Sequence, residues 1–99
     1  MSKLTNSEYQ RLAEIFKKFA STPRLKILIA LSESEKNVSE LIEICDLSQS
    51  ATSHQLKTLK EGRLVKSRRV SSEVLYSLDD QHVFDILKIA IDHVIGHCE

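Results

Sequence analysis

The chain has 99 residues, with 14 basic and 14 acidic side chains and a formal net charge of zero. This length supports a single domain, residues 1–99, whose modest core dimerisation would help to complete. No apolar run approaches the ~20 residues of a membrane span, and the first residues lack the features of a signal peptide. We therefore expect a soluble, cytoplasmic protein. Cys45 and Cys98 are too few and too far apart for a disulfide framework, and we expect Cys45 to be a small buried apolar residue.

The charges are unevenly distributed. Six basic residues and one acidic residue lie between Lys57 and Arg69, whereas five acidic residues and one basic residue lie between Asp79 and Glu99. A basic middle and an acidic tail predict one face for a polyanion and another for a cation.

Two helices are predicted before residue 32. A capping box from Thr5 to Glu8 begins the first helix, in which apolar residues recur at helical spacing. Thr22 and Pro23 supply the N-cap and the first helical position of the second helix.

A shorter pair of helices follows the polar connector 32–37. Ser39 is predicted to cap a helix over 40–45, with Leu41 and Ile44 facing inward. After a tight turn, Ser48 caps the next helix, 49–61.

The pattern changes after Gly62, which we expect to end the preceding helix in a left-handed conformation. Apolar residues then recur with a period of two in segments 64–70 and 73–78, which predicts a β-hairpin, and a last helix continues to His97. The expected fold is mostly α with one β-hairpin.

The short capped helix, tight turn and second capped helix form a helix-turn-helix, whose second helix can enter the DNA major groove. Its first turns carry neutral hydrogen-bonding side chains suited to base edges, and lysines and hairpin arginines follow where the sugar-phosphate backbone would pass. The alternative is a solvated polar helix with a basic surface. The predicted DNA-binding residues are Gln49, Ser50, Thr52, Ser53, His54, Gln55, Lys57, Lys60, Arg68 and Arg69.

The last helix carries three of the four histidines, His82, His93 and His97, with Asp80 just before them. His82 and His93 are eleven residues apart, roughly 16 Å along a helix, so metal–nitrogen bonds of about 2 Å cannot join them within one chain. Eleven steps of ~100° nevertheless return to nearly the same face. If two copies pack antiparallel, Asp80 and His82 of one chain meet His93 and His97 of the other, which predicts an intersubunit metal site formed twice per dimer.

A simpler interpretation gives these residues only helix-end roles. Asp79 or Asp80 is a natural N-cap, and His97 would interact well with the dipole at the C-terminus. Against this interpretation, Phe84, Ile89 and Ile95 make the last helix apolar on more than one side. A helix apolar on several sides is buried on several sides, here by a second copy.

Five segments resemble the ArsR/SmtB family of winged-helix repressors, and the resemblance runs from about Leu12 to His97. They are Thr22–Leu31 (TPRLKILIAL), Val38–Leu41 (VSEL), Leu47–Lys57 (LSQSATSHQLK), Gly62–Val65 (GRLV) and Val74–Leu78 (VLYSL). The third is quite specific to the family. The resemblance implies a winged helix-turn-helix homodimer, built through the N- and C-terminal helices. It also implies repression of an operon until an inducer, often a metal ion, releases the DNA.

The resemblance also distinguishes between inducer sites. Members that sense arsenic, lead or cadmium have a Cys-x-Cys pair where this chain has residues 37–39, without cysteine. The zinc- and cobalt-sensing branch has Asp-x-His at the start of the last helix, matched by Asp80 and His82, and a histidine matched by His93. Gly96 stands at its fourth ligand position, and His97 follows one residue later. We therefore expect Asp80, His82, His93 and His97 to bind Zn(II), or Co(II), with Cys98 or water as alternatives to His97.

Other functions remain open. The same fold could sense thiol oxidation or persulfide through Cys45 and Cys98, or could be a DNA-binding dimer without an inducer. A zinc hydrolase based on His93 and His97 would lack the glutamate that acts as general base in such a motif. We therefore expect no enzymatic activity and no small-molecule substrate.

Overall fold

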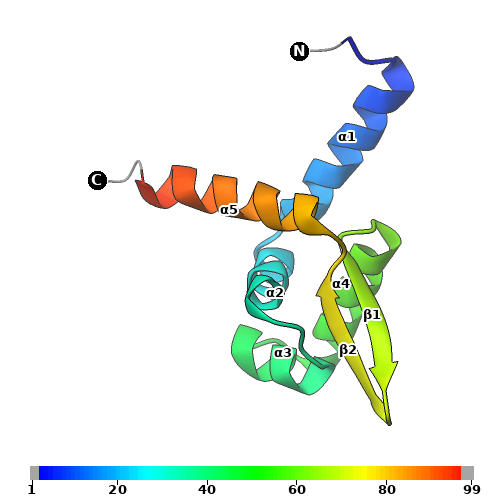
Figure 1. Ribbon diagram of the computed structural model, residues 1–99, viewed down its shortest axis with the longest axis vertical. Helices are drawn as coiled ribbons and strands as arrows, with labels where there is room; N and C mark the ends of the chain where they lie inside the picture. The colour runs from blue at the N-terminus through cyan, green and yellow to red at the C-terminus, as the bar shows by residue number, and fades with distance from the viewer. Residues whose placement is uncertain (1–2, 97–99) are drawn as a thin grey trace.

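The computed structural model describes residues 3–96, so His97 and Cys98 lie outside the described residues. Its elements are α1 (Asn6–Phe19), α2 (Thr22–Glu33), α3 (Val38–Cys45), α4 (Gln49–Glu61), β1 (Val65–Val70), β2 (Glu73–Leu78) and α5 (Gln81–Gly96). This order confirms the predicted winged helix-turn-helix (Figure 1). Within residues 3–96, no helix combines the length and apolar character needed to cross a membrane.

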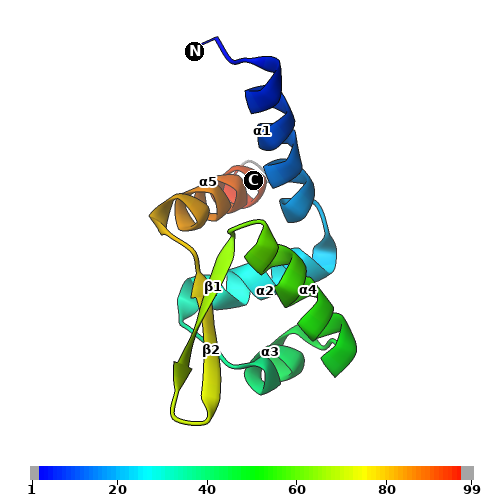
Figure 2. The ribbon, with the colours of Figure 1, turned by 90° about the vertical axis from the view of Figure 1, so that its right-hand side faces the viewer.

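The helices α2, α3 and α4 and the hairpin form a compact body, from which α1 and α5 extend. Figures 1 and 2 show α1 at one end of the molecule, α3 and the hairpin tip at the other end, and α5 between them, near the middle of the long axis. Every element except β2 contributes a buried apolar side chain to the core, and Tyr76 and Leu78 of β2 pack against it. The buried apolar members of the core are Phe19, Ile27, Leu28, Ala30, Leu31, Leu41, Cys45, Leu56, Leu59, Leu64, Val65, Val83 and Leu87.

Helix starts follow side-chain capping, and this corrects two predictions. The N-cap of α2 is Ser21, not Thr22, because the Ser21 Oγ accepts from the Arg24 amide. The N-cap of α3 is Asn37, not Ser39. Asn37 Oδ1 accepts from the Glu40 amide at 2.8 Å, and Glu40 Oε1 accepts from the Asn37 amide at 2.9 Å. This reciprocal pair satisfies two amides that the first turn leaves without helical acceptors, so α3 begins two residues earlier than predicted.

The inward faces of α3 and α4 are set by helical periodicity. Leu41 is fully buried, as predicted, and Leu56 and Leu59 are almost fully or fully buried as well. Ile44 is 55% exposed, so the prediction that it faces inward is wrong. Cys45, one residue later, takes the buried position instead.

The connector 32–37 is not merely a polar loop. Lys36 pairs with Tyr76 of β2, since each backbone amide donates to the other residue's carbonyl, at 3.0 and 2.8 Å. The Lys36 side chain is buried, and its Nζ donates to the Ser34 carbonyl and hydroxyl. Strand β2 therefore has backbone partners on both edges, β1 on one and Lys36 on the other.

The end of α4 differs from the prediction. Gly62 has φ −82° and ψ 0°, a right-handed conformation, and the left-handed residue is Arg63 with φ 60°. Glycine at 62 leaves room for α1, because a Cβ there would lie 2.2 Å from Lys18 Cδ.

We expect Gly62→Ala to change the free energy of unfolding by no more than about 1 kcal/mol. The backbone conformation suits alanine, and the flexible end of Lys18 can rotate away. Urea unfolding at fixed protein concentration measures the change. A loss well above this value would mean that Lys18 cannot move aside for the added methyl group.

Candidate functional site

Local hydrogen bonds connect α3 to α4 through the turn between them. Asp46 takes a left-handed conformation at φ 54°, and the Leu47 amide donates to the Ile42 carbonyl across the turn. Ser48 then caps α4, since its Oγ accepts from the Ala51 amide at 3.1 Å. These contacts fix the direction in which α4 leaves the turn, as a DNA-reading helix requires.

The exposed face of α4 carries most of the predicted DNA-binding residues. Gln49, Ser50, Ser53, His54, Lys57 and Lys60 are exposed. Lys60 Nζ also donates to Ser67 Oγ at 2.8 Å, which brings its charge beside the middle of β1.

Thr52 is a correction. It is 0% exposed, and its hydroxyl donates to the Ser48 carbonyl at 2.8 Å. Its position shares the inward face of α4 with Leu56 and Leu59, so it stabilises the helix rather than reaching DNA. Gln55 is half-buried on the flank of α4, where its Oε1 accepts from Arg24.

The hairpin arginines differ in their surroundings. Arg68 forms a two-point ion pair with Glu35, in which Nε lies 3.0 Å from Oε2. The hydrogen bond from Arg68 holds the pKa of Glu35 below its usual value, and the carboxylate raises the pKa of Arg68. Asn37 Nδ2 similarly donates to Glu73 beside the hairpin tip. Arg69 is exposed and takes no part in the ion pair between Arg68 and Glu35. Of the two arginines, Arg69 is therefore the one whose charge is left for DNA.

Sequence reasoning missed Glu35 and Arg24. Glu35 is an exposed acid in a polar segment, and nothing local indicates its partner 33 residues away. Arg24 carries a clearer signal, as a charged residue at the start of an apolar helix.

The start of α5 brings Asp80 and His82 together. Asp80 Oδ1 accepts from the Val83 amide at 3.2 Å, and its other oxygen, Oδ2, lies 3.4 Å from His82 Nδ1. The hydrogen bond from Val83 lowers the pKa of Asp80, with a smaller effect from His82. A tetrahedral ion with bonds of ~2 Å separates its ligands by roughly 3.3 Å. Capping and metal binding by Asp80 are therefore compatible, because they use different oxygens.

The other half of the predicted site lies elsewhere on α5. His93 is exposed in the last turns of the helix, about 16 Å along the axis from His82. Among residues 3–96, one chain brings no three His, Cys, Asp or Glu side chains together in a cluster suited to a metal. His97 and Cys98 lie outside the described residues.

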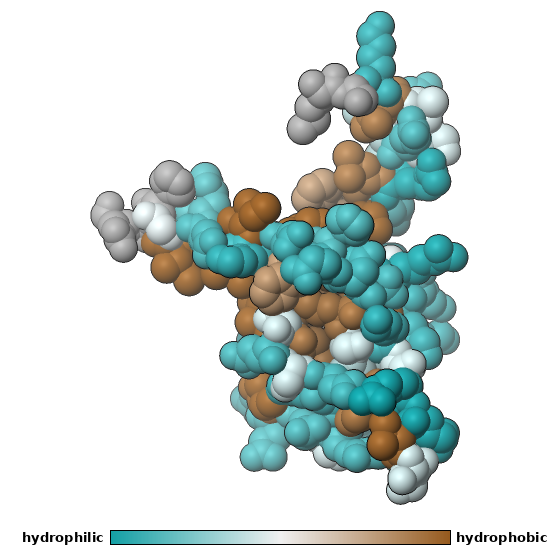
Figure 3. Space-filling view, viewed as in Figure 1, coloured by the Kyte–Doolittle hydropathy of each residue, from teal (hydrophilic) through white to brown (hydrophobic). Residues whose placement is uncertain are grey.

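An apolar surface covers α1 and α5. Tyr9 and Phe16 of α1 are 58% and 57% exposed. Ile89, Val94 and Ile95 of α5 are exposed as well, and Figure 3 shows apolar surface on both helices. A groove of about 280 Å³ lies between them, lined by Phe16, Phe19, Ala20, Leu25, Ile86, Leu87 and Ala90. Contiguous exposed apolar surface of this kind marks an interface.

Cys45 is 3% exposed in the core, as predicted. Burial raises the pKa of its thiol, although Lys26 nearby acts in the opposite direction. Burial keeps reagents away from the thiol and also reduces the fraction of thiolate, which is the reactive form. Both effects disfavour a sensor role for Cys45.

We expect Cys45 in a Cys98→Ala protein to react with iodoacetamide at least about tenfold more slowly when folded than in urea. Mass spectrometry of timed samples measures the rate. Equal rates in the two states would restore Cys45 as a sensor candidate.

Comparison with known proteins identifies the family. The family model "Bacterial regulatory protein, arsR family" matches residues 21–67. The transcriptional repressor SmtB homolog of Synechocystis is 42% identical over 85 residues, 86% of this chain and 64% of that protein, so the chain spans less than two thirds of this relative. The cadmium resistance transcriptional regulatory protein CadC homolog of Staphylococcus aureus is 36% identical over 83 residues, 83% of this chain and 69% of that protein.

The solved structures agree in fold. The homodimeric winged helix-turn-helix DNA-binding domain of Mb0332 from Mycobacterium bovis superposes with a TM-score of 0.88 at 24% identity, covering 100% of this chain and 94% of that chain. This likeness concerns the fold alone. The family match and the identity to the CadC homolog show that the chain belongs to the arsR family of bacterial regulatory proteins.

Proposed function

We propose that this chain forms a homodimer that binds operator DNA as a repressor and releases it when Zn(II), or Co(II), binds between the two α5 helices. The observation that carries the proposal is the approach of Asp80 Oδ2 and His82 Nδ1, 3.4 Å apart, at the start of α5, the helix that carries the exposed His93 near its other end.

The homodimer is supported by the apolar faces of α1 and α5, which a second copy would bury. The Mb0332 domain, which has the same fold, is homodimeric. Two-fold symmetry also places two α4 helices on one side of a dimer, where they can meet successive major grooves about 34 Å apart.

DNA binding is supported by the exposed polar face of α4 and the cationic residues beside it. Direct readout would come from Gln49, Ser50, Ser53 and His54, and Lys57, Lys60 and Arg69 would contact phosphates. Arg68 would contribute less while it is paired with Glu35.

The metal site is supported by the donor set. One carboxylate and two or three imidazoles suit Zn(II) or Co(II) better than thiophilic ions. Asp80 and His82 of one subunit and His93 of the other, with His97, Cys98 or water completing the set, would hold the ion. The two relatives are named as a repressor and as a cadmium resistance regulator, which favours a metal as the signal.

Release would follow from geometry. A metal ion would hold residues 80–82 of one subunit against residue 93 of the other, which would restrict the angle between the two α5 helices. The two α4 helices would then lose the spacing that fits the DNA. Thermodynamic reciprocity requires DNA to weaken metal binding by the same factor.

Fluorescence anisotropy with a duplex selected from a random-sequence pool tests the proposal. We expect tight binding by the metal-free protein and at least about tenfold weaker binding with one equivalent of Zn(II) per chain. Tight binding that Zn(II) and Co(II) both leave unchanged would contradict the inducer assignment, and absence of any selected duplex would contradict DNA binding itself.

Lys57→Gln should weaken DNA binding on all sequences and lower the salt dependence. Each lost phosphate contact removes about 0.9 from the slope of log K against log salt, so a dimer should lose about two. Lys3→Gln, at an exposed lysine before α1, is the matched control. A loss of sequence discrimination without a change in slope would instead place Lys57 at a base edge.

A further inference from the structure

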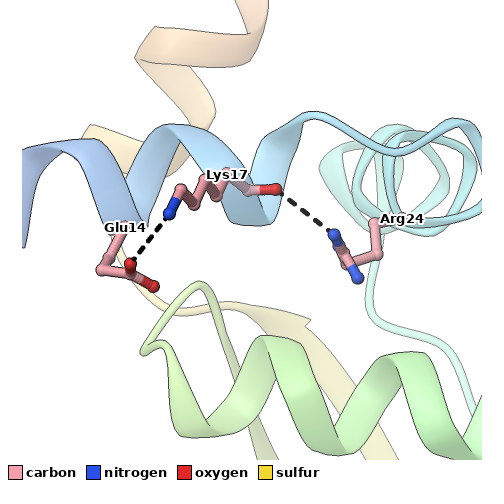
Figure 4. A network of polar contacts seen from close by, with 3 residues as sticks. All are labelled: Glu14, Lys17 and Arg24. Carbon is pink, nitrogen blue, oxygen red and sulfur yellow. Dashed lines mark hydrogen bonds and ion pairs between the residues drawn. The ribbon is translucent and has the colours of Figure 1, made fainter.

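Arg24 lies at the start of α2, between the end of α1 and the flank of α4. Figure 4 shows its guanidinium directed toward the Lys17 carbonyl, whereas the Lys17 side chain points away toward Glu14. The Arg24 side chain is half-buried in this position.

The guanidinium makes three hydrogen bonds to two different helices. Nε donates to the Lys18 carbonyl at 2.9 Å, and Nη2 donates to the Lys17 carbonyl at 3.2 Å. Nη1 donates to Gln55 Oε1 of α4 at 3.1 Å. The Lys17 carbonyl also accepts from the Ala20 amide at 3.2 Å, within the cap of α1. Arg24 therefore adds donors to the carbonyls of the last turn of α1 while it holds α4. The planar fork of arginine suits this bridging role, which a lysine ammonium could not reproduce.

The bridge also fixes how Gln55 is presented. Because arginine can only donate hydrogen bonds, the Gln55 oxygen must face Arg24, and its amide N–H groups remain for other partners. A second contact supports the same connection, since the Lys18 side chain lies over Gly62 at the end of α4.

We propose that Arg24 is a positioning residue that transmits the orientation of α1 to the DNA-reading helix α4. The inference rests on the proposed function, in which α1 belongs to the dimer interface and α4 reads DNA. A change in the packing of the two subunits would then move the α1 carbonyls, and Arg24 would carry that movement to Gln55.

The test compares the ratio of DNA affinities without and with Zn(II) in wild type, Arg24→Gln and Lys17→Gln. Lys17→Gln is the matched control, because it removes only the exposed pair with Glu14 and keeps the carbonyl that Arg24 uses. We expect Arg24→Gln to reduce the ratio by about 3- to 30-fold and Lys17→Gln to leave it unchanged. A purely structural role would lower the thermal midpoint of Arg24→Gln without changing the ratio, and that outcome would overturn the proposal.

The state of the Arg24→Gln protein must be measured before its DNA affinities are compared. Sedimentation and circular dichroism establish whether Arg24→Gln is folded and dimeric. If it is not, Gln55→Ala, which keeps both bonds to α1, is measured instead, and an unchanged ratio there overturns the proposal.

Hydrogen exchange gives a readout that needs no metal. DNA should slow exchange in the last turn of α1 in wild type and Lys17→Gln but not in Arg24→Gln. Equal protection in all three proteins would contradict coupling through Arg24. The wild type could bind DNA and show this protection without responding to Zn(II). That result would contradict the inducer assignment in the proposed function but not the role of Arg24.

Discussion

His82→Ala is expected to abolish metal-driven release of DNA while DNA affinity without metal stays within about twofold of wild type. The side chain is 90% exposed and its nitrogen lies 3.4 Å from the carboxylate of Asp80, so its loss removes a ligand without disturbing the core. Removing partners that only orient a ligand costs 10–100-fold in metal affinity, so loss of the ligand itself should cost at least about 100-fold. Anisotropy titrations with and without Zn(II) measure both quantities.

Asp85→Asn provides the control for this experiment. Asp85 is an exposed carboxylate on the same helix and accepts from Gln81 Nε2 at 2.9 Å, outside the proposed ligand set. We expect it to respond to Zn(II) as wild type does. If His82→Ala also responded normally, His82 would not be a ligand and the C-terminal site would have to be abandoned.

Leu59→Ala is expected to lower the free energy of unfolding by about 2–5 kcal/mol. Leu59 is fully buried on the inward face of α4, and truncation leaves a cavity beneath the DNA-reading helix. Since natural domains are stable by only about 5–15 kcal/mol, a large part of the stability should disappear. Urea unfolding at one fixed protein concentration measures the loss, because dimerisation makes stability depend on concentration.

Glu43→Ala on the exposed face of α3 should remain within about 0.5 kcal/mol of wild type. A loss below about 1 kcal/mol for Leu59→Ala would show that α4 is not anchored in the core as described.

The order and type of the elements could be predicted because local signals agree with the tertiary structure. The capping box at Thr5 and Glu8 is present, and Ser48 caps α4 as predicted. The errors arose where several candidates compete locally. Asn37 and Ser39 can both cap a helix, and only Asn37 has Glu40 three residues later to complete the reciprocal pair. The pairing of Lys36 with Tyr76 depends on residues 40 positions apart and has no local signal.

The DNA-reading face was predictable in outline but not residue by residue. A threonine on α4 suits base contact by its chemistry, yet helical phase turns Thr52 into the core beside Leu56. The ion pair between Glu35 and Arg68 and the bridge from Arg24 to Gln55 join residues more than 30 positions apart. The pairing of Asp80 with His82 is local and was predictable from spacing, whereas the approach of His93 that we propose would depend on a second subunit.

Mixed dimers test the central claim, an intersubunit metal site, most directly. Each His82→Ala or His93→Ala homodimer lacks a ligand in both sites, whereas a mixed dimer keeps one complete site. Co(II) titrations followed by visible absorption should therefore show weak d–d bands for either variant alone. After unfolding and refolding the two together, intense tetrahedral bands should appear, saturating at about one metal per four chains with random pairing. No gain of absorption on mixing, in proteins shown to exchange subunits, would contradict a site shared between the two α5 helices.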